Sequence, residues 1–507
     1  MRRICALFGC FLTLSASYSA VAGDPPVVVP TTATPASFST RSNPYLGYDL
    51  PDLGGPANAL ISKADEYSIG RMVLREVRDS GLLMEDPEVT DYIQQLGMRL
   101  ASQAHDEGQS FTYNVMKEPV VNAGAIGRLV LINSGLILMT DNESELASVV
   151  AHETGHIVQR HMARAIEAQS HMSLINMAAM LAAIALGAMA GGGQGAEGAI
   201  ALTQAASYQQ QVNLIRGNEI EADAVGIELL AGAGFDPNEM ANEFELFSRM
   251  EGLSLAGIPP LLIDHPVTSE RVAAARNRAA TFPPSKPLPE SLSYELFKER
   301  VRVLALPPEE HVDQYYSRLR DRRPLSAAER YGEALVQMQN HNAAAAVAIL
   351  RELVAQNPQV TMLYATLGQA LVANNQMPEA LEFFRQTNIL FPRNVPLTVR
   401  YAETLMQANR APEAHTLLLD LFNNADPTPA QIRLTALAAN AAGDAGDAYE
   451  YMAEYDLVGG QLALANQQLE LALATPGLTG QQKAKFRARL EQVRGWLREQ
   501  QASRRTG

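Results

Sequence analysis

Cysteine is nearly missing from this chain, and its two copies, Cys5 and Cys10, both lie close to the N-terminus. The rest of the chain can therefore form no disulfide, and it offers neither a thiolate metal ligand nor a cysteine nucleophile. Positive charge is also scarce, since 40 Lys and Arg residues stand against 55 Asp and Glu, a formal net charge of -15. Because phosphate binding needs a basic surface, we expect no nucleic acid partner.

The N-terminus also lacks an apolar run long enough to span a bilayer. Its apolar stretch, Ile4 to Leu14, follows two arginines and precedes the small residues Ala20 to Ala22. This order is typical of a secretory signal peptide, so we predict cleavage near Ala22 and export of the mature chain. A short membrane anchor and lipid attachment at Cys10 are the two alternatives.

Composition shifts divide the chain into five parts. Pro, Ser, Thr and Gly dominate residues 23–58, which cannot bury a core. A second Pro-rich stretch, "TFPPSKPLPES", is predicted to be a linker. The predicted parts are a signal peptide (1–22), a disordered segment (23–58), a first folded domain (59–280), the linker (281–291) and a helical domain (292–500).

The first folded domain mixes two hydrophobic periods. Apolar residues recur at helical spacing in "DEYSIGRMVLREVRDSGLL" and "DPEVTDYIQQLGMRLASQA". The next stretch, "FTYNVMKEPVVNAGAIGRLVLINSGLILM", is rich in β-branched residues with glycine punctuation, which predicts two or three short strands. Thr140 to Glu143, "TDNE", matches a capping box and predicts the start of the following helix. We therefore expect mainly helices with a small β-sheet.

The helical domain is repetitive. The positions that recur at a spacing of 34 are Ala346, Ala380, Ala414 and Ala448, and Pro358 and Pro392 share this interval. This period, with small residues where paired helices cross and Pro after the second helix, is typical of tetratricopeptide repeats. A generic helical bundle is the alternative. Leu292 to Arg320 and Gln461 to Arg498 match the repeat poorly, as terminal repeats often do.

The segment "SELASVVAHETGHIVQRHMAR" places two imidazoles and a carboxylate in an otherwise apolar helix. His152 and His156 are four residues apart, share one face and suit a tetrahedral Zn²⁺. Glu153 lies about 100° around the helix, where it acts on water instead of binding the ion. Burying such groups without partners is costly, so we expect one zinc ion per chain. An ordinary exposed helix is the alternative, and the apolar flanks disfavour it.

A zinc site needs a third protein ligand. His161 falls off the ligand face. The segment "RGNEIEADAVGIELLAGAGF" predicts a second amphipathic helix that begins near Asn218. In it Glu219 and Asp223 share a face, while Glu221 points roughly opposite. We predict Glu219 as the third ligand and Asp223 as the acceptor that orients a ligand imidazole; a solvated helix start is the alternative.

Three segments together, "SELASVVAHETGH", "NEIEADAVGI" and "DHPVTSERVAAARNRA", resemble the M48 peptidases. With the signal peptide and the C-terminal repeats, the arrangement is similar to the β-barrel assembly-enhancing protease group of bacterial envelopes, from about Leu60 to the C-terminus. The resemblance implies a gluzincin-like HExxH catalytic domain followed by a helical tetratricopeptide solenoid. It also implies zinc ligands and a general base at matching positions. These are His152, His156 and Glu219 for zinc and Glu153 for the base.

The resemblance further implies a location and partners. We expect the periplasm of a Gram-negative bacterium, with unfolded or misassembled outer-membrane proteins as substrates, a chaperone role, and the β-barrel assembly machinery bound through the repeats. Relatives carry an aromatic residue where "NAGAIG" has Gly124, so the substrate groove differs here. We expect Leu129 to Ile132 to form an edge strand that takes up an extended substrate by β-augmentation.

Two further segments carry hypotheses. His265, in the loop "IPPLLIDHPVTSER", is expected to approach the zinc, either as a fourth ligand that displaces the water or as a group that stabilises the oxyanion; an ordinary surface histidine is the third option. Leu174 to Leu202 is apolar and rich in Ala and Gly. We favour a helical lid or hairpin with peripheral membrane contact over a transmembrane span for this segment.

Three function classes stay open. The favoured one is a periplasmic zinc endopeptidase, because the HExxH motif, Glu219 and Asp223 are all intact. The second is a non-proteolytic tetratricopeptide chaperone or scaffold with a silent zinc site. The third is a membrane-embedded protease, which would need several apolar spans.

Overall fold

The computed structural model describes residues 61–104, 106, 110–168, 205–253, 261, 265–283, 291–306 and 312–506. The predicted signal peptide, the predicted disordered segment and Leu174 to Leu202 lie outside these ranges, as does most of the predicted linker. Among the described helices, none combines the length and the apolar character that a membrane span requires.

A three-stranded sheet lies in the first domain. Its strands are β1 (Thr112–Met116), β2 (Ala123–Ile126) and β3 (Leu129–Asn133), in the order β1-β3-β2. β3 pairs in parallel with β1 and antiparallel with β2. The prediction that Leu129 to Ile132 forms an edge strand is therefore wrong, because this stretch is the central strand. Its continuous run of Leu, Val and Ile is buried on both faces, and β2 is the edge on its side of the sheet.

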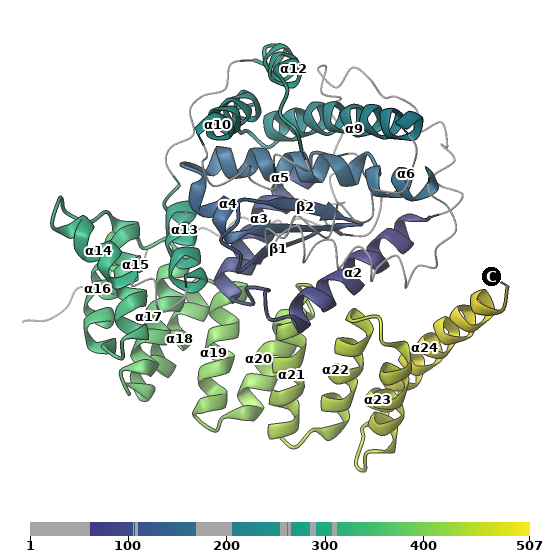
Figure 1. Ribbon diagram of the computed structural model, residues 1–507. Coiled ribbons are helices and arrows are strands. Elements are labelled where there is room, and N and C mark those ends of the chain that lie inside the picture. The colour runs from purple at the N-terminus through teal and green to yellow at the C-terminus, as the bar shows by residue number, and fades with distance from the viewer. Residues whose placement is uncertain are drawn as a thin grey trace, which may run out of the picture. The chain divides into compact units, whose positions relative to one another are not determined.

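Helices cover this sheet. They are α2 (Lys63–Asp79), α3 (Pro87–Ala101), α4 (Ser134–Met139), α5 (Glu143–Val158), α6 (His161–Ala168), α9 (Ala205–Gly232), α10 (Glu239–Leu253) and α12 (Ser269–Ala279). Figure 1 shows α5 between the sheet and α9. The two helices pack extensively against each other, which brings the motifs of both into contact.

Glycine permits the close approach of α5 and α9. A Cβ atom at Gly155 would lie 2.7 Å from the carbonyl oxygen of Ala222. One at Gly226 would lie 3.1 Å from the backbone nitrogen of His152. Backbone atoms cannot move away from a side chain as a flexible neighbour could, so larger residues at these two positions would force the helices apart.

The start of α5 differs from the sequence prediction. Its N-cap is Asn142, whose side chain accepts a hydrogen bond from the backbone N–H of Glu145. The capping box predicted at Thr140 to Glu143 is therefore wrong by two residues. Thr140 instead donates its hydroxyl to the carbonyl of Ile137 at the end of α4, so a residue that resembles an N-cap serves the preceding helix.

The start of α9 also differs from the prediction. The helix begins at Ala205, well before the predicted start near Asn218. Glu219 and Asp223 consequently lie in the interior of a long helix rather than in its first turn. The alternative of a solvated helix start does not apply to these acids, because both are buried.

The C-terminal domain consists of consecutive helices that pair in sequence order. They are α13 (Leu292–Ala305), α14 (Val312–Arg320), α15 (Ala327–Gln339), α16 (Ala343–Gln356), α17 (Thr361–Ala373), α18 (Met377–Leu390), α19 (Val395–Gln407), α20 (Ala411–Phe422), α21 (Pro429–Ala441), α22 (Ala445–Val458), α23 (Leu462–Ala474) and α24 (Gly480–Thr506). The four recurring alanines lie at equivalent buried positions of α16, α18, α20 and α22. This confirms the predicted helical repeat.

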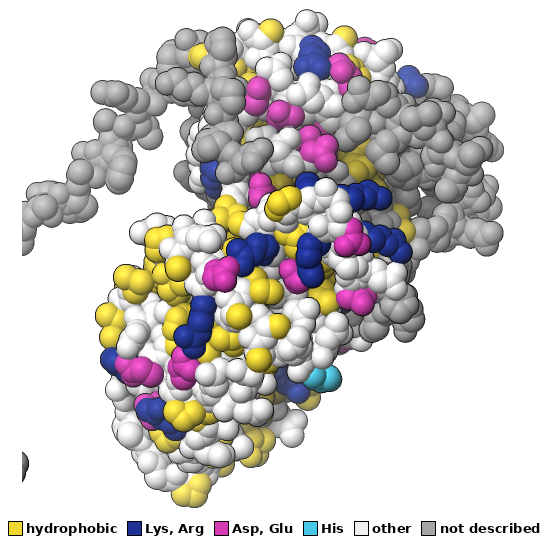
Figure 2. Space-filling view, turned by 90° about the vertical axis from the view of Figure 1, so that its left-hand side faces the viewer, with side chains coloured by type: hydrophobic (Ala, Val, Ile, Leu, Met, Phe, Trp, Pro, Cys, Tyr) yellow, Lys and Arg dark blue, Asp and Glu magenta, His cyan; other side chains and the backbone are white. Residues whose placement is uncertain are grey.

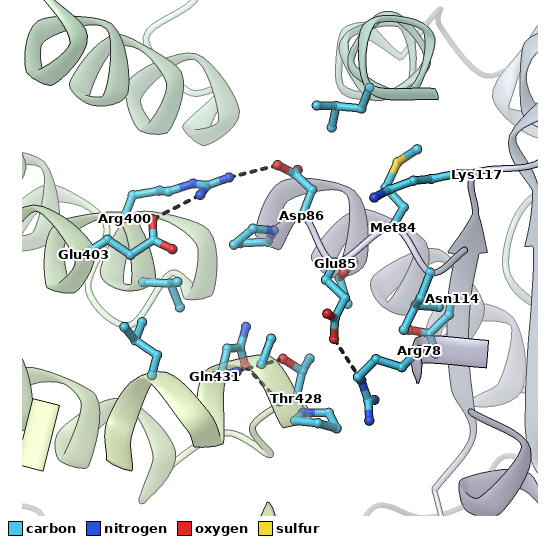
Figure 3. A pocket seen from close by; sticks show the side chains of 18 of the residues that line it. Arg78, Met84, Glu85, Asp86, Asn114, Lys117, Arg400, Glu403, Thr428 and Gln431 are labelled. Atoms are coloured by element: carbon cyan, nitrogen blue, oxygen red, sulfur yellow. Dashed lines mark hydrogen bonds and ion pairs between the residues drawn. The ribbon is translucent and has the colours of Figure 1, made fainter. Parts of the chain in front are cut away.

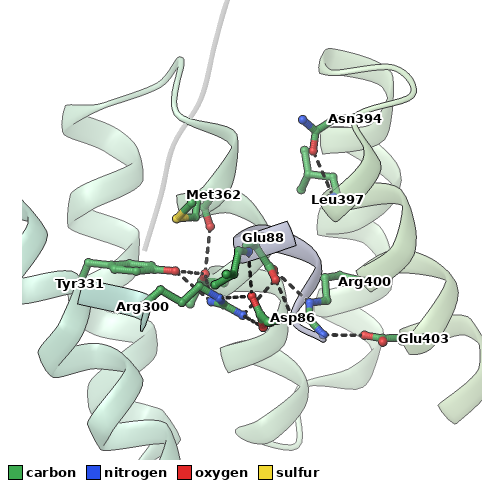
Figure 4. Close-up of polar contacts among 11 residues, drawn as sticks. Asp86, Glu88, Arg300, Tyr331, Met362, Asn394, Leu397, Arg400 and Glu403 are labelled. Atoms are coloured by element: carbon green, nitrogen blue, oxygen red, sulfur yellow. Dashed lines mark hydrogen bonds and ion pairs between the residues drawn. The ribbon is translucent and has the colours of Figure 1, made fainter. Parts of the chain in front are cut away.

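A buried cluster of ionised groups joins the first domain to the repeats (Figure 4). Asp86 caps the N-terminus of α3, and Glu88 lies in its first turn. Arg300 of α13 donates to Asp86 at 2.7 Å and to Glu88 at 3.0 Å. Arg400 of α19 donates to Asp86 at 2.9 Å and to Glu88 at 2.6 Å. Burial alone would raise the pKa of Asp86, but the two arginines hold it well below its usual value.

A second junction is built from backbone carbonyls. Arg71 and Arg75 of α2 donate to carbonyl oxygens at the C-terminal end of α22, including Val458 and Gly459, each at 2.8 Å. Helix C-termini carry partial negative charge, so a guanidinium is a favourable partner there. The repeats thus contact the first domain at helices far apart in the sequence.

The exposed surface of the repeats is mixed in charge. On the face that Figure 2 presents, acidic and basic side chains lie next to one another among small hydrophobic patches. Ion pairs between neighbouring repeat helices, such as Arg330–Glu352 and Arg351–Glu379, are exposed on at least one side. Such exposed pairs contribute little to stability, because water and salt screen them.

We expect Arg300→Gln to lower the free energy of unfolding by about 3 kcal/mol, because it leaves two buried carboxylates with one cation fewer. The measurement is the denaturation midpoint in urea. Arg351→Gln, which removes an exposed ion pair, is the matched control and should cost about 0–1 kcal/mol. Equal shifts for both variants would contradict the importance assigned to the buried cluster.

Candidate metal centre

Four side chains from three segments converge beside α5. His152 and His156 come from α5, Glu219 from α9, and His265 from the loop before α12. One donor atom of each lies within 4.8 Å of the other three. The structure therefore brings together the two motif histidines, the predicted third ligand and the loop histidine.

The spacing of these donor atoms suits a tetrahedral metal ion. His152 Nε2 lies 3.0 Å from His156 Nε2 and 3.3 Å from His265 Nδ1. Glu219 oxygens lie 3.4 Å from His156 Nε2 and 3.1 Å from His265 Nδ1. Tetrahedral Zn²⁺ with bonds of about 2.0–2.1 Å holds its donors roughly 3.3–3.4 Å apart. The residues present thus fit the ion in both chemistry and spacing.

The electrostatics of the cluster indicate the same need for a cation. Burial opposes ionisation of Glu219, yet His265 and His152 hold the pKa of its carboxyl far below the usual value. Burial and the neighbouring histidines hold the pKa of His156 well below its usual value. His156 and Glu219 thus favour the forms that coordinate zinc, a neutral imidazole and an ionised carboxylate, whereas His152 and His265, whose pKa values the neighbouring acids raise, would release a proton on binding the ion.

A second layer of polar contacts orients His152. Its Nδ1 lies 2.9 Å from an Asp223 oxygen. Burial alone would lower the pKa of His152, but Asp223 and Glu219 raise it to about 10. The Asp223 contact fixes the ring with Nε2 directed at the other donors, which is the arrangement that supports a metal-ligating histidine.

Arg271 of α12 holds the acids of this layer, and the sequence analysis assigned it no role. Its guanidinium donates to both Asp223 oxygens, at 2.8 and 2.7 Å, and lies 3.0 Å from a Glu219 oxygen. A further bond to the carbonyl of Pro266 ties the His265 loop to α12. The arginine lies in the family segment "DHPVTSERVAAARNRA", and that membership is the one signal that points to it.

Glu153 is buried on the side of α5 that faces His265, whose Nε2 lies 3.6 Å from Oε1 of Glu153. A small cavity of about 20 Å³ adjoins both residues. Glu243 of α10 also lines it and accepts a hydrogen bond from the hydroxyl of Ser148. Burial raises the pKa of Glu243 to about 8, so this second acid is largely neutral at pH 7. No motif in the sequence points to Glu243.

His161 and Glu221, the two residues that the sequence placed away from the ligand face, lie behind the donor cluster. His161 Nδ1 is 2.8 Å from Nδ1 of His156, the ring nitrogen opposite the one in the cluster. Glu221 is 3.3 Å from His161 and also binds Arg164. His161 is therefore outside the ligand group and supports His156, and Glu221 points away from the cluster towards α6.

Comparison with known proteins places this geometry in a family. Residues 87–279 match peptidase family M48, and residues 371–439 match the tetratricopeptide repeat. The β-barrel assembly-enhancing protease of Escherichia coli K12 is 32% identical over 454 residues, which cover 88% of this chain and 91% of that protein.

The chain belongs to peptidase family M48. The β-barrel assembly-enhancing protease of Yersinia pestis is 31% identical to it over 455 residues, again 88% of this chain and 91% of that protein. The metalloprotease LoiP of Escherichia coli K12 is 26% identical over 235 residues, 44% of this chain and 88% of that protein. M48 peptidases are metal-dependent, and the donor cluster is the group that could bind a metal in the described residues.

We expect Asp223→Asn to weaken metal binding by about 10- to 100-fold, because the charge that orients His152 is lost. Affinity is measured by competition with a chromophoric chelator. Glu228→Gln is the control, since this acid lies on the same helix but binds Arg278 instead. Unchanged affinity in Asp223→Asn would show that the contact does not orient the ligand.

Proposed function

We propose that this M48 peptidase is a zinc-dependent endopeptidase, with one zinc ion per chain. The observation that carries the proposal is the convergence of three imidazoles and one carboxylate at near-tetrahedral spacing, beside a buried glutamate. His152, His156 and Glu219 would hold the ion, with His265 as a fourth ligand in the resting state. Arg271 and Asp223 support this role by keeping the donors charged and oriented.

The proposed reaction is hydrolysis of an internal peptide bond. When bound, zinc lowers the pKa of water to about 7 and polarises a carbonyl as a Lewis acid. Glu153 accepts the proton of the attacking water and delivers it to the leaving amine. Its burial beside a small cavity restricts the number of waters that compete for this proton.

Substrate is proposed to bind as an added strand. β2 is an edge of the sheet and lies against α5, the helix that carries Glu153, so an extended chain paired with it would lie beside this helix. Main-chain hydrogen bonds supply such binding without demanding a particular sequence. Gly124, within β2, adds no side chain to either face of the sheet at this position.

Location and partners follow from the similarity to the β-barrel assembly-enhancing proteases. We propose a periplasmic protein of a Gram-negative bacterium that acts in outer-membrane protein assembly and quality control, with unfolded or misassembled outer-membrane proteins as substrates. The repeats would bind the β-barrel assembly machinery and give the chain a chaperone role. The signal-peptide pattern at residues 1–22 supports export.

We expect Glu153→Gln to retain bound metal and native stability but to lose at least about 100-fold in proteolysis, because the amide cannot accept the proton. The assay is cleavage of an unfolded protein such as casein, with metal content measured on the same sample. Full activity in a metal-loaded sample would remove Glu153 from the reaction. Client binding by a wild-type chain that cleaves nothing would favour the scaffold alternative.

We expect His265→Ala to raise proteolysis, because the cluster would lose a donor that excludes the attacking water. The measurement is the initial rate of casein cleavage relative to wild type at equal metal content. A lower rate would instead indicate that His265 stabilises the oxyanion. An unchanged rate would exclude both roles.

A further inference from the structure

The acids that line the cavity between the first domain and the repeats each have a cationic partner within the chain. This cavity has a volume of about 430 Å³. Glu85 accepts a hydrogen bond from Arg78 at 2.8 Å. Asp86 and Glu403 accept from Arg400, at 2.9 and 3.0 Å (Figure 3). The lining residues are distinct from the donor cluster, so this network acts on the domain junction and not on the metal centre.

A different chain of polar contacts begins at the metal centre itself. His156 directs Nε2 at the donor cluster, and its Nδ1 lies 2.8 Å from Nδ1 of His161. Nε2 of His161 lies 3.3 Å from a Glu221 oxygen, and Arg164 donates to the same oxygen at 2.5 Å. His161 is 5% exposed, whereas the side chain of Glu221 is 46% exposed. The contacts therefore run from the buried centre to the surface.

A continuous helix could not bring the two histidines together. Residues five positions apart in an α-helix are separated by about 140° around the axis and about 7.5 Å along it. α5 instead ends at Val158, and Arg160 adopts a φ of 55° before α6 begins at His161. This left-handed conformation is unfavourable for a residue with a side chain. The turn returns the ring of His161 to His156, with the ring centroids 4.8 Å apart and the planes at 79°.

Contacts of Arg160 hold this turn in place. Its Nε donates to the buried carboxylate of Glu66 at 3.0 Å, and its Nη2 donates to the carbonyl of Ile61 at 2.6 Å. Its own carbonyl accepts from the backbone N–H of Arg164 at 3.0 Å, at the start of α6. Strained backbone persists only where the surroundings over-determine it, and it is concentrated at functional sites. Arg160 thus fixes the position of His161 next to a proposed metal ligand.

The distance between the two rings determines where the hydrogen atoms lie. Two nitrogen atoms 2.8 Å apart hold one hydrogen atom between them. A neutral histidine that binds a metal through Nε2 carries its hydrogen on Nδ1, so His156 is the donor and His161 is the acceptor. The hydrogen of His161 then lies on Nε2, which faces Glu221. In the reversed arrangement, the hydrogen of His156 would lie on Nε2 and would block this nitrogen from binding a metal.

We propose that His161 is a positioning residue of the metal centre, which accepts the Nδ1–H of His156 and so keeps Nε2 of this ligand free for the ion. Glu221 and Arg164 hold His161 in the accepting form. Ligand histidines commonly donate in this way to a carboxylate, a carbonyl or a water; here the acceptor is a second imidazole. The inference rests on the proposed zinc site and deepens it.

Two substitutions separate the role of an acceptor from a role in packing. His161→Asn retains an acceptor, because its amide oxygen lies at about the place of Nδ1, whereas His161→Phe retains a ring that accepts nothing. We expect His161→Phe to weaken zinc binding by about tenfold and His161→Asn to weaken it by less than about threefold. A role in packing predicts the opposite order. Affinity is measured on the full chain by competition with a chromophoric chelator.

Nuclear magnetic resonance gives a readout that a change in packing would not produce. In the zinc-loaded chain with ¹⁵N-labelled histidine, the Nδ1–H of His156 should give a slowly exchanging resonance that is coupled to a second imidazole nitrogen. His161→Asn should keep the resonance and lose the coupling, and His161→Phe should lose both. A wild-type chain without this coupling would contradict the hydrogen bond between the two rings.

Two further variants complete the experiment. His415→Phe is the matched control, because it removes another buried histidine, in α20 of the repeats, and should leave zinc affinity unchanged. Glu221→Leu changes an exposed acid, so it tests the same contacts if His161→Phe does not fold, and we expect it to weaken zinc binding by about threefold.

The outcomes distinguish this role from the zinc site on which it rests. Zinc binding by the wild type with equal affinity in His161→Phe, or a greater loss in His161→Asn than in His161→Phe, would overturn the role of His161 alone. Unchanged affinity in Glu221→Leu would do the same where His161→Phe does not fold. A wild-type chain that binds no zinc would overturn the zinc site, and the role of His161 with it.

Discussion

The close contact of α5 and α9 is the constraint on which the centre depends. The ligands of α5 can meet Glu219 only where two helix backbones touch, and glycine is the residue that permits such contact. Gly155 and Gly226 lie on facing helices, each next to backbone atoms of the other. The spacing of donor atoms is therefore determined by main-chain packing, which is stiffer than any side-chain arrangement.

Around this contact, charge is arranged in layers. Arg271 bonds to Asp223, Asp223 to His152, and the imidazole directs its far nitrogen to the cluster. Each buried charge thereby has a partner of opposite sign or a donor, as burial requires. Glu243 is the contrasting case, because the effect of burial outweighs those of the Ser148 hydroxyl and of His152 and so favours the neutral acid. Two carboxyl groups of the same region thus differ in charge at neutral pH.

Local sequence patterns were sufficient to predict much of this structure. The HExxH spacing, the helical period and the repeat of 34 residues each depend on neighbours within one or two helices, and all three can be recognised in the sequence. Features set by distant contacts were missed. The central position of β3 depends on which strand pairs with β1, and this is a tertiary property. The start of α9 lies in a stretch of sequence without a strong N-cap signal. Arg271 and Arg300 resemble surface arginines until tertiary packing surrounds them with acids.

The cluster of Asp86, Glu88, Arg300 and Arg400 limits how far the two domains can be separated or exchanged. Separated from the repeats, the first domain would present two adjacent carboxylates without the two guanidinium groups that bind them here, and Arg300 and Arg400 would lose these carboxylates as partners. A peptidase domain and a repeat domain from different relatives could therefore be combined only if one carried the two carboxylates and the other carried the two arginines. In this chain the two domains are therefore expected to unfold together.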